Sequence, residues 1–140
     1  MPMIDLYAPK NLFPEGTERQ LASELTLALL HAEGVQEPTP VHLNNTAVYI
    51  HKFEPELIHT AAEGAAKVVR IQVLTPPHVL TSDGQKYLVK TATEIVQRLS
   101  GDETQGNRTW VLLTEAADGG WGIGGKAYDL KGFASLLSGR

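Results

Sequence analysis

Apolar residues recur along this chain in two matching patterns, one over 21–32 and the other over 88–99. Both patterns follow the period of an amphipathic helix. Each ends at a glycine, Gly34 or Gly101, the residue type commonest just past the end of a helix. The matching apolar positions are Leu21, Ala22, Leu25, Ala28, Leu29 and Ala32, followed by Leu88, Val89, Ala92, Ile95, Val96 and Leu99. The spacing therefore predicts two equivalent helices.

The beginnings of the two helices carry different signals. Ser82 is followed three positions later by Gln85, a spacing typical of a capping box at a helix N-terminus. Pro14 suits the first turn of the earlier helix, because proline lacks the amide hydrogen that this turn does not use. We therefore expect helices that begin near these residues.

Short strand patterns lie on both sides of each helix. Ile4 and Leu6 alternate with polar residues within 2–7, and Ile71 and Val73 repeat that alternation at the interval that separates the two helices. After the helices, apolar segments at 46–50 and 109–113 match each other at a slightly shorter interval. Each half of the chain therefore reads as strand, helix, strand, and a helix between two strands predicts a right-handed parallel crossover.

These elements predict an α/β (α+β) fold built from two β-α-β repeats in one domain, 1–140. We place the first repeat at about 2–64, the second at about 65–126, and a short C-terminal segment at 127–140. Together the repeats would form a four-stranded mixed sheet with two helices on one face. No sequence is left to cover the other face, which predicts that the protein is an oligomer.

Composition narrows the classes of function. The chain has 140 residues, a net charge of −4 and no cysteine, which excludes disulfides and thiolate chemistry. It has no basic stripe for nucleic acid or anionic membranes, no apolar run long enough to span a bilayer, and no signal-peptide pattern. The histidines do not follow a metal-binding motif, so no metal is expected. We expect a cytoplasmic protein that contacts neither nucleic acid nor membrane.

One residue at the start of the chain has chemical potential. If Met1 is removed, Pro2 becomes a free secondary amine attached to the first predicted strand. A free α-amino group titrates near about 8, and an apolar or cationic environment lowers this pKa by disfavouring the ammonium form. Pro2 is therefore a candidate general base near neutral pH. If Met1 is retained, the nitrogen is an amide with no basicity.

Two further segments support a family resemblance. The run Leu80-Thr81-Ser82-Asp83-Gly84-Gln85-Lys86 is similar to the helix entry of 4-oxalocrotonate tautomerase. The segments 112–116 and 120–125, the latter Gly-Trp-Gly-Ile-Gly-Gly, are similar to its strand and closing hairpin. With the proline at position 2 and the two repeats, nearly the whole chain resembles the tautomerase superfamily, which includes macrophage migration inhibitory factor. The resemblance implies a tautomerase/MIF-like fold, a homotrimer and no metal or organic cofactor.

The resemblance also implies roles for individual residues. Pro2 matches the catalytic proline, and Trp121 matches the aromatic residue that closes the active site. Trp110 occupies the position of a substrate-binding arginine, and Arg108, two positions earlier on the same strand, would supply the missing charge. His42 and Asn45, in the loop before the second strand, are the other candidates for binding the substrate's carboxylate.

The implied activity is keto–enol tautomerisation of a small 2-keto acid or aryl pyruvate, a small-molecule carboxylate, with the amine of Pro2 as general base and acid. Two alternatives remain open. One is decarboxylation, hydration or dehalogenation assisted by protonated Pro2, although segment 74–81 lacks the arginines that the dehalogenases keep there. The other is a trimeric binding module without catalysis.

Overall fold

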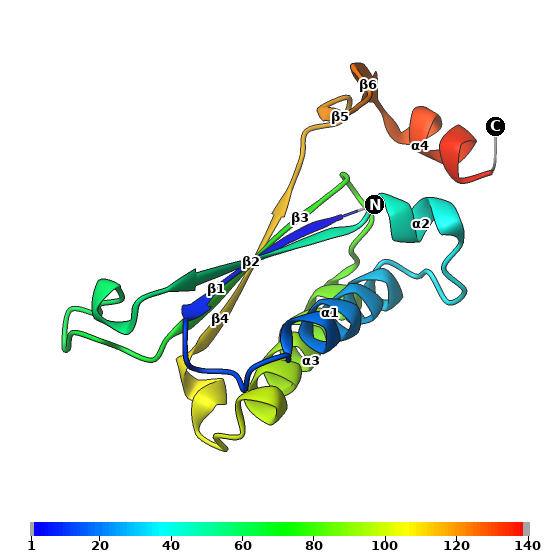
Figure 1. The fold of residues 1–140 in the computed structure, drawn as a ribbon. Coiled ribbons are helices and arrows are strands. Elements are labelled where there is room, and N and C mark those ends of the chain that lie inside the picture. The colour runs from blue at the N-terminus through cyan, green and yellow to red at the C-terminus, as the bar shows by residue number, and fades with distance from the viewer. Residues whose placement is uncertain (1, 139–140) are drawn as a thin grey trace.

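The computed structural model describes residues 2–138, and it is built on a four-stranded mixed sheet (Figure 1). The strand order is β2-β1-β3-β4, in which the two central strands, β1 and β3, are antiparallel and each outer strand is parallel to its neighbour. The strands are β1 Met3–Pro9, β2 Ala47–Phe53, β3 Val69–Thr75 and β4 Thr109–Glu115. The predicted fold class is thereby confirmed. The predicted loss of Met1 concerns a residue outside the described range, as does the end of the C-terminal segment, 139–140.

Two long helices, α1 (Glu18–Ala32) and α3 (Ser82–Ser100), cover one face of the sheet (Figure 1). The core between the two layers contains the apolar residues predicted from the helical period, including Leu21, Leu25 and Leu88, each at most 1% exposed. Burial of such a side chain is worth about 1.5–3 kcal/mol. Amphipathic helices are marginal alone, so this packing against the sheet stabilises them.

The helix ends show where the sequence signals were right and where they were wrong. Gly101 has φ of 74°, a left-handed conformation that glycine adopts without strain, and it ends α3 as predicted. The N-cap of α3 is Thr81, not Ser82, since the Thr81 hydroxyl accepts a hydrogen bond from the Gly84 amide at 3.0 Å. The prediction for Pro14 was also wrong. The first helix begins only after Thr17, and Pro14 lies in the preceding turn.

The two repeats are related by a pseudo-two-fold axis between the central strands. Met3 pairs with Leu74, and Tyr7 pairs with Arg70. Met3 and Arg70 are equivalent positions of the two repeats, as are Tyr7 and Leu74, so exchanging the repeats converts one pair into the other. The register thus maps onto itself around the pairing of Asp5 with Gln72. The match between the two apolar patterns in the sequence therefore reflects a spatial equivalence.

Several elements lie outside the repeat pattern. They are a short helix α2 (Pro40–Asn44), two 3-10 turns, η1 (Pro55–Leu57) and η2 (Gln105–Arg108), a hairpin of β5 (Trp121–Ile123) and β6 (Lys126–Tyr128), and a helix α4 (Leu130–Leu137). The hairpin turn has positive φ at both Gly124 and Gly125, as a tight turn of this kind requires. The boundary near 126 between the second repeat and the C-terminal segment stays a prediction. From there on the described chain forms β6 and α4. None of the helices within 2–138 combines the length and apolarity needed to cross a bilayer.

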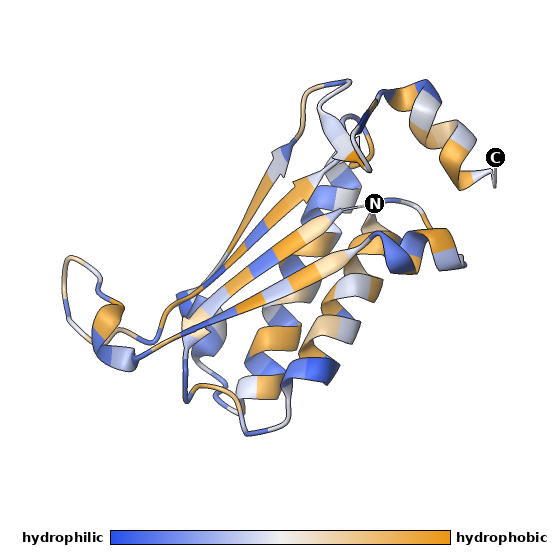
Figure 2. Cartoon of the chain, turned by 45° about the horizontal axis from the view of Figure 1, so that its top comes forward, coloured by the Kyte–Doolittle hydropathy of each residue, from blue (hydrophilic) through white to orange (hydrophobic). Residues whose placement is uncertain are grey.

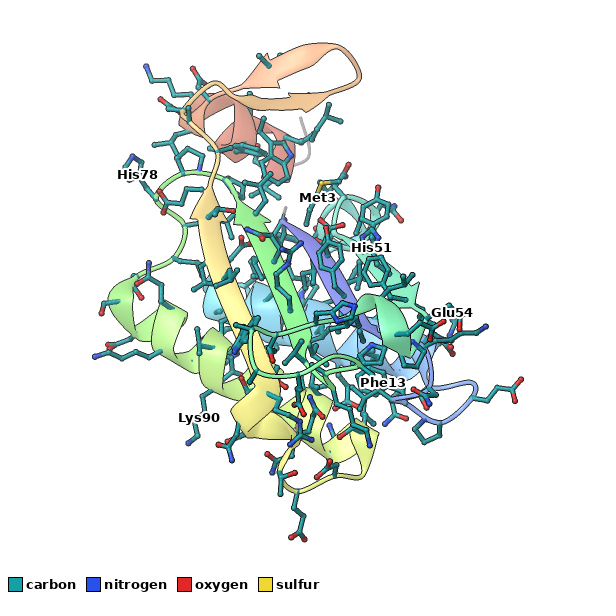
Figure 3. All side chains as sticks on the ribbon, turned by 90° about the vertical axis from the view of Figure 1, so that its left-hand side faces the viewer. Met3, Phe13, His51, Glu54, His78 and Lys90 are labelled. Atoms are coloured by element: carbon teal, nitrogen blue, oxygen red, sulfur yellow. The ribbon has the colours of Figure 1, made fainter. Side chains whose placement is uncertain are left out.

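The other face of the sheet is open, and it mixes polar and large apolar side chains (Figure 2 and Figure 3). Tyr49 on β2 is 51% exposed and Leu112 on β4 is 44% exposed. Figure 3 looks onto this open face, with Met3 near the end of the sheet that lies under the C-terminal hairpin and His51 farther along. Apolar residues exposed together on both outer strands agree with the expectation that another chain covers this face.

Candidate active site

Pro2 is buried at the end of the sheet where β1 begins. Because Met3 pairs with Leu74 in an antiparallel ladder, continuing the register by one position puts Pro2 opposite Thr75. Thr75 is fully buried, and its Oγ1 has no hydrogen-bond partner within the described residues. The buried hydroxyl of Thr75 therefore lies on the strand position opposite Pro2. Residues paired in this way have their Cβ atoms about 5 Å apart.

A cavity of about 340 Å³ opens beside Pro2 on the open face of the sheet. Met3 and Leu74, the direct neighbours of Pro2 and Thr75 in the chain, form its floor, and the loop after α2 contributes Asn45. The C-terminal hairpin contributes Trp121. The cavity therefore brings together two of the residues predicted from the sequence, Asn45 and Trp121, next to a third, Pro2.

Trp121 is held in place by the C-terminal segment. It is 8% exposed, and its ring lies edge-on to Phe133 of α4, with 6.2 Å between ring centroids. Met3 and Val41 pack against the same small apolar cluster. Helix α4, which the sequence pattern did not predict, thus fixes the tryptophan that covers the beginning of β1.

Helix α2 positions the two polar candidates of the first repeat. The backbone N–H of Thr39 donates to Nδ1 of His42 at 3.1 Å, so the neutral imidazole carries its proton on Nε2. Burial lowers the pKa of His42, and the positive charge of the chain's amino terminus lowers it further. Asn45 uses its amide N–H₂ to donate to the Val41 carbonyl at 2.9 Å. His42 is therefore a neutral residue that helps to cap α2, whereas Asn45 faces the cavity.

Glu33 is a titratable residue near the amino terminus that the sequence analysis did not consider as a site residue. It follows the last turn of α1, and burial raises the pKa of its carboxyl, while the positive charge of the amino terminus acts in the opposite direction. The end of α1 is close to the beginning of α3, because a Cβ at Gly84 would lie 2.6 Å from the carbonyl oxygen of Ala32. The only available signal in the sequence was an acidic residue directly after Ala32, the last residue of the apolar helical pattern.

Arg108 lies at the opposite end of the sheet, and its guanidinium is fully engaged. It donates to Asp102 Oδ2 at 2.8 Å, to Gln105 Oε1 at 3.1 Å and to the Lys67 carbonyl at 3.3 Å. These contacts close the loop before β4. Within one chain, the structure gives Arg108 a role in packing and does not bring it to the cavity beside Pro2.

Trp110 is also distant from Pro2 within the chain. It pairs with Arg70, which pairs in turn with Tyr7, near the far end of β1 from Pro2. At about 3.3 Å for each step along a strand, the separation of Tyr7 from Pro2 is about 17 Å. Trp110 is 49% exposed and lines a second cavity of about 320 Å³ at that end of the sheet.

The described residues do not form a recognisable metal centre, because residues 2–138 hold no cluster of three or more histidine, aspartate or glutamate side chains with metal-binding geometry. The cavity beside Pro2 has an amide and an aromatic ring in its wall and little room for a large cofactor.

No protein-family model and no curated protein matches this sequence. Solved structures do match over nearly the whole chain. A wild-type fused 4-OT, described as a symmetric trimer, has a TM-score of 0.75 at 14% identity and covers 99% of each chain. A protein designated Pt0534, inactivated by 2-oxo-3-pentynoate, has a TM-score of 0.75 at 15% identity, again over 99% of each chain. A macrophage migration inhibitory factor-like protein from Entamoeba histolytica has a TM-score of 0.71 at 15% identity and covers 91% of this chain and 98% of its own. The resemblance seen in the sequence is therefore confirmed at the level of the fold, which is that of the tautomerase superfamily.

Proposed function

We propose that this protein is a keto–enol tautomerase that acts on a small 2-keto acid or aryl pyruvate. The observation that carries the proposal is the position of Pro2, which is buried at the start of β1, next in the chain to Met3, which lines a cavity together with Trp121 and Asn45. Once Met1 is removed, the Pro2 amine can take a proton from the enol hydroxyl or the α-carbon and return one at the other position.

The surroundings support the proposed roles. Trp121 and Met3 give the cavity an apolar wall, which favours the neutral amine over the ammonium form. Asn45 is the polar residue placed to hold the substrate's carboxylate or the developing enolate. His42 acts mainly by holding the loop that carries Asn45. Neither Arg108 nor Trp110 enters this role within one chain.

We also propose a homotrimer. The open face exposes Tyr49 and Leu112 on the two outer strands. A fused 4-OT of similar fold is described as a symmetric trimer. Burying such side chains against a neighbouring copy would contribute about 1.5–3 kcal/mol each.

Decarboxylation, hydration and dehalogenation are the second candidate class, since protonated Pro2 in the same cavity could assist them. The resemblance implies that dehalogenases of this superfamily keep arginines in the segment that corresponds to 74–81. Segment 74–81 contains no arginine, and the cavity beside Pro2 has no arginine or lysine in its wall. Tautomerisation is therefore favoured.

The test compares two forms of the protein that differ at the amino terminus. The trimmed form begins at Pro2, whereas the extended form keeps residues before it, so that the nitrogen is an amide. Phenylenolpyruvate should ketonise about 10²–10⁴-fold faster with the trimmed form, which is the usual contribution of a general base. Pro2→Ala should lose much of this rate, while Pro14→Ala, in an exposed turn, should keep it.

Chemical labelling gives an independent readout. The acetylenic keto acid 2-oxo-3-pentynoate, which inactivates a protein of similar fold, should modify the trimmed form at the Pro2 nitrogen, as peptide mass spectrometry would show. Equal ketonisation by the trimmed and extended forms, with no label on Pro2, would refute the proposal and favour a binding module without catalysis.

A further inference from the structure

Thr75, the last residue of β3, carries a buried hydroxyl that has no role in holding the fold together. The residue is 0% exposed, and its Oγ1 has no hydrogen-bond partner within residues 2–138. Its backbone carbonyl is satisfied, because it accepts a hydrogen bond from the Ala116 N–H at 2.9 Å. Buried hydroxyls in native proteins almost always have a partner. The unpaired Oγ1 therefore indicates a partner that arises in another form of the protein.

Other threonines at the strand ends show the usual arrangement. The hydroxyl of Thr109, at the beginning of β4, donates to the Gln105 carbonyl at 2.9 Å. The hydroxyl of Thr114, near the end of the same strand, donates to the Val73 carbonyl at 2.8 Å. Thr75 differs from both, because the buried position that it occupies offers its hydroxyl no such carbonyl.

The residue opposite Thr75 explains the difference. Side chains alternate between the two faces of a strand, so Thr75 shares the helix-covered face with Val73, and Pro2 shares it with Ile4. The register places Pro2 opposite Thr75 on the neighbouring strand. While Met1 is attached, the Pro2 nitrogen is a tertiary amide without a hydrogen and has nothing to donate. Removal of Met1 turns this nitrogen into a secondary amine with an N–H.

One hydrogen bond would fix the orientation of that amine. A neutral secondary amine has one N–H and one lone pair, which point in different directions. If the N–H donates to Thr75 Oγ1 on the helix-covered face, the lone pair is left for the other side, where Met3 and Leu74 line the cavity. The protonated amine has two N–H groups, so it can keep the bond to Thr75 while the second proton is transferred.

From this arrangement we infer that Thr75 is a positioning residue, whose hydroxyl accepts an N–H of the Pro2 amine and directs its lone pair toward the cavity. The inference rests on the proposed function of Pro2 as the base. The ammonium form is the stronger donor, so the same hydrogen bond favours it and raises the pKa of Pro2. Thr75 thus acts against the apolar wall formed by Met3 and Trp121, which favours the neutral amine.

The positive charge of the amino terminus also acts on two titratable groups, Glu33 after α1 and His42 in α2. Both groups affect the amine equally in the wild type and in every variant of Thr75. A comparison between variants therefore isolates the contribution of the Thr75 hydroxyl.

The first test measures the amine itself, with no substrate present. In the trimmed form labelled with ¹⁵N-proline, the Pro2 nitrogen is the proline nitrogen that titrates, and its NMR shift reports its protonation. Thr75→Val should lower the midpoint by about one pH unit, about a tenfold change in the proton-dissociation constant. Thr75→Ser should keep the wild-type midpoint, and so should Thr109→Val, which removes a buried hydroxyl at the opposite end of the sheet. An unchanged or raised midpoint in Thr75→Val, or an equal shift in Thr109→Val, would overturn the inference.

The second test measures the ketonisation of phenylenolpyruvate by the same samples. Thr75→Val should lower kcat about tenfold, because the lone pair is no longer held in one direction. KM should stay the same, since Thr75 does not line the cavity, and Thr75→Ser should restore kcat. A raised KM with unchanged kcat would contradict a positioning role. If the trimmed wild type ketonises no faster than the extended form, the proposed function fails, whereas the nitrogen titration still decides whether Thr75 holds the amine.

Discussion

Replacing Thr75 with valine tests the position of Pro2 directly, because the two residues face each other across β1 and β3. Thr75 Oγ1 is buried and has no hydrogen-bond partner within the described residues. Leaving a buried polar group unsatisfied costs about 1–3 kcal/mol. Valine has nearly the same shape without the hydroxyl. In the extended form, where the Pro2 nitrogen is an amide without a hydrogen, Thr75→Val should therefore raise the free energy of unfolding by about 1–3 kcal/mol.

The trimmed form should behave differently. Its Pro2 amine carries a hydrogen that can be donated to Thr75 Oγ1, and an ordinary hydrogen bond of this kind contributes about 0.5–1.5 kcal/mol. In this form the Thr75 hydroxyl already has a hydrogen-bond partner, so Thr75→Val removes a hydrogen bond and not an unsatisfied group. The gain in the free energy of unfolding should therefore shrink to near zero or reverse. The difference between the two forms measures the coupling between Thr75 and the amine, as in a double-mutant cycle.

The assay is urea denaturation followed by circular dichroism at one fixed protein concentration, because the stability of an oligomer depends on concentration. Thr75→Ser, which keeps the hydroxyl and loses only the methyl group, should be destabilised similarly in both forms. An equal gain from Thr75→Val in both forms would show that the amine does not reach Thr75, and the placement of Pro2 derived from the register would be wrong. A loss of stability in the extended form would show that the hydroxyl has a partner.

Two further predictions concern pH and assembly. Because burial lowers the pKa of His42 below its ordinary 6.5, the native state binds fewer protons than the unfolded chain, and stability should fall as pH falls from about 6.5 through the lowered pKa. His42→Gln, which can still accept the Thr39 N–H, should flatten this part of the profile measured by thermal denaturation, whereas His78→Gln in an exposed loop should not. In light scattering the protein should have about three times the chain mass of 15.2 kDa, and Leu112→Arg on the open face should reduce this mass. Leu27→Arg, similarly exposed on α1, should leave the mass unchanged, and a monomeric wild-type protein would contradict the proposed trimer.

The sequence predicted most of the fold because its duplication repeated the apolar patterns of the helices and strands. Leu21 and Leu88 had matching apolar neighbours, and both patterns ended at glycine, so the helices supported each other as predictions. The N-cap of α3 was missed by one position, since Thr81 and Ser82 have equally suitable hydroxyls and only the backbone conformation distinguishes them. Helices α2 and α4 are too short for a clear period, and packing stabilises them.

The candidate site was harder to predict because it depends on which ends of the strands meet. Trp110 lies at the beginning of β4, whereas Arg108, which the sequence analysis placed on the same strand, ends the 3-10 turn η2 just before it. Strand β4 is parallel to β3, which is antiparallel to β1. The beginning of β4 therefore lies at the opposite end of the sheet from Pro2. The hairpin after β4 returns to the end of the sheet where Pro2 lies, so Trp121 packs near Met3. Matching residues to a family predicted their positions along the chain. Their distances from Pro2 depend on how the strands pair in the sheet, which the structure supplies.

The pseudo-two-fold axis explains why one chain can hold two cavities with different properties. A duplication first produces two equivalent cavities, but only the first strand of the chain can begin with an amine. The equivalent position in the second repeat is Val69, inside the polypeptide, where a basic nitrogen cannot form. The second cavity has no amine whose pKa must be kept in a working range, so a charged residue such as Arg70 is tolerated there. The same positive charge in place of Met3, beside Pro2, would disfavour the ammonium form and change the pKa of the base. The different chemistry of Met3 and Arg70 at equivalent positions is therefore expected when only one of the two repeats can carry an amine.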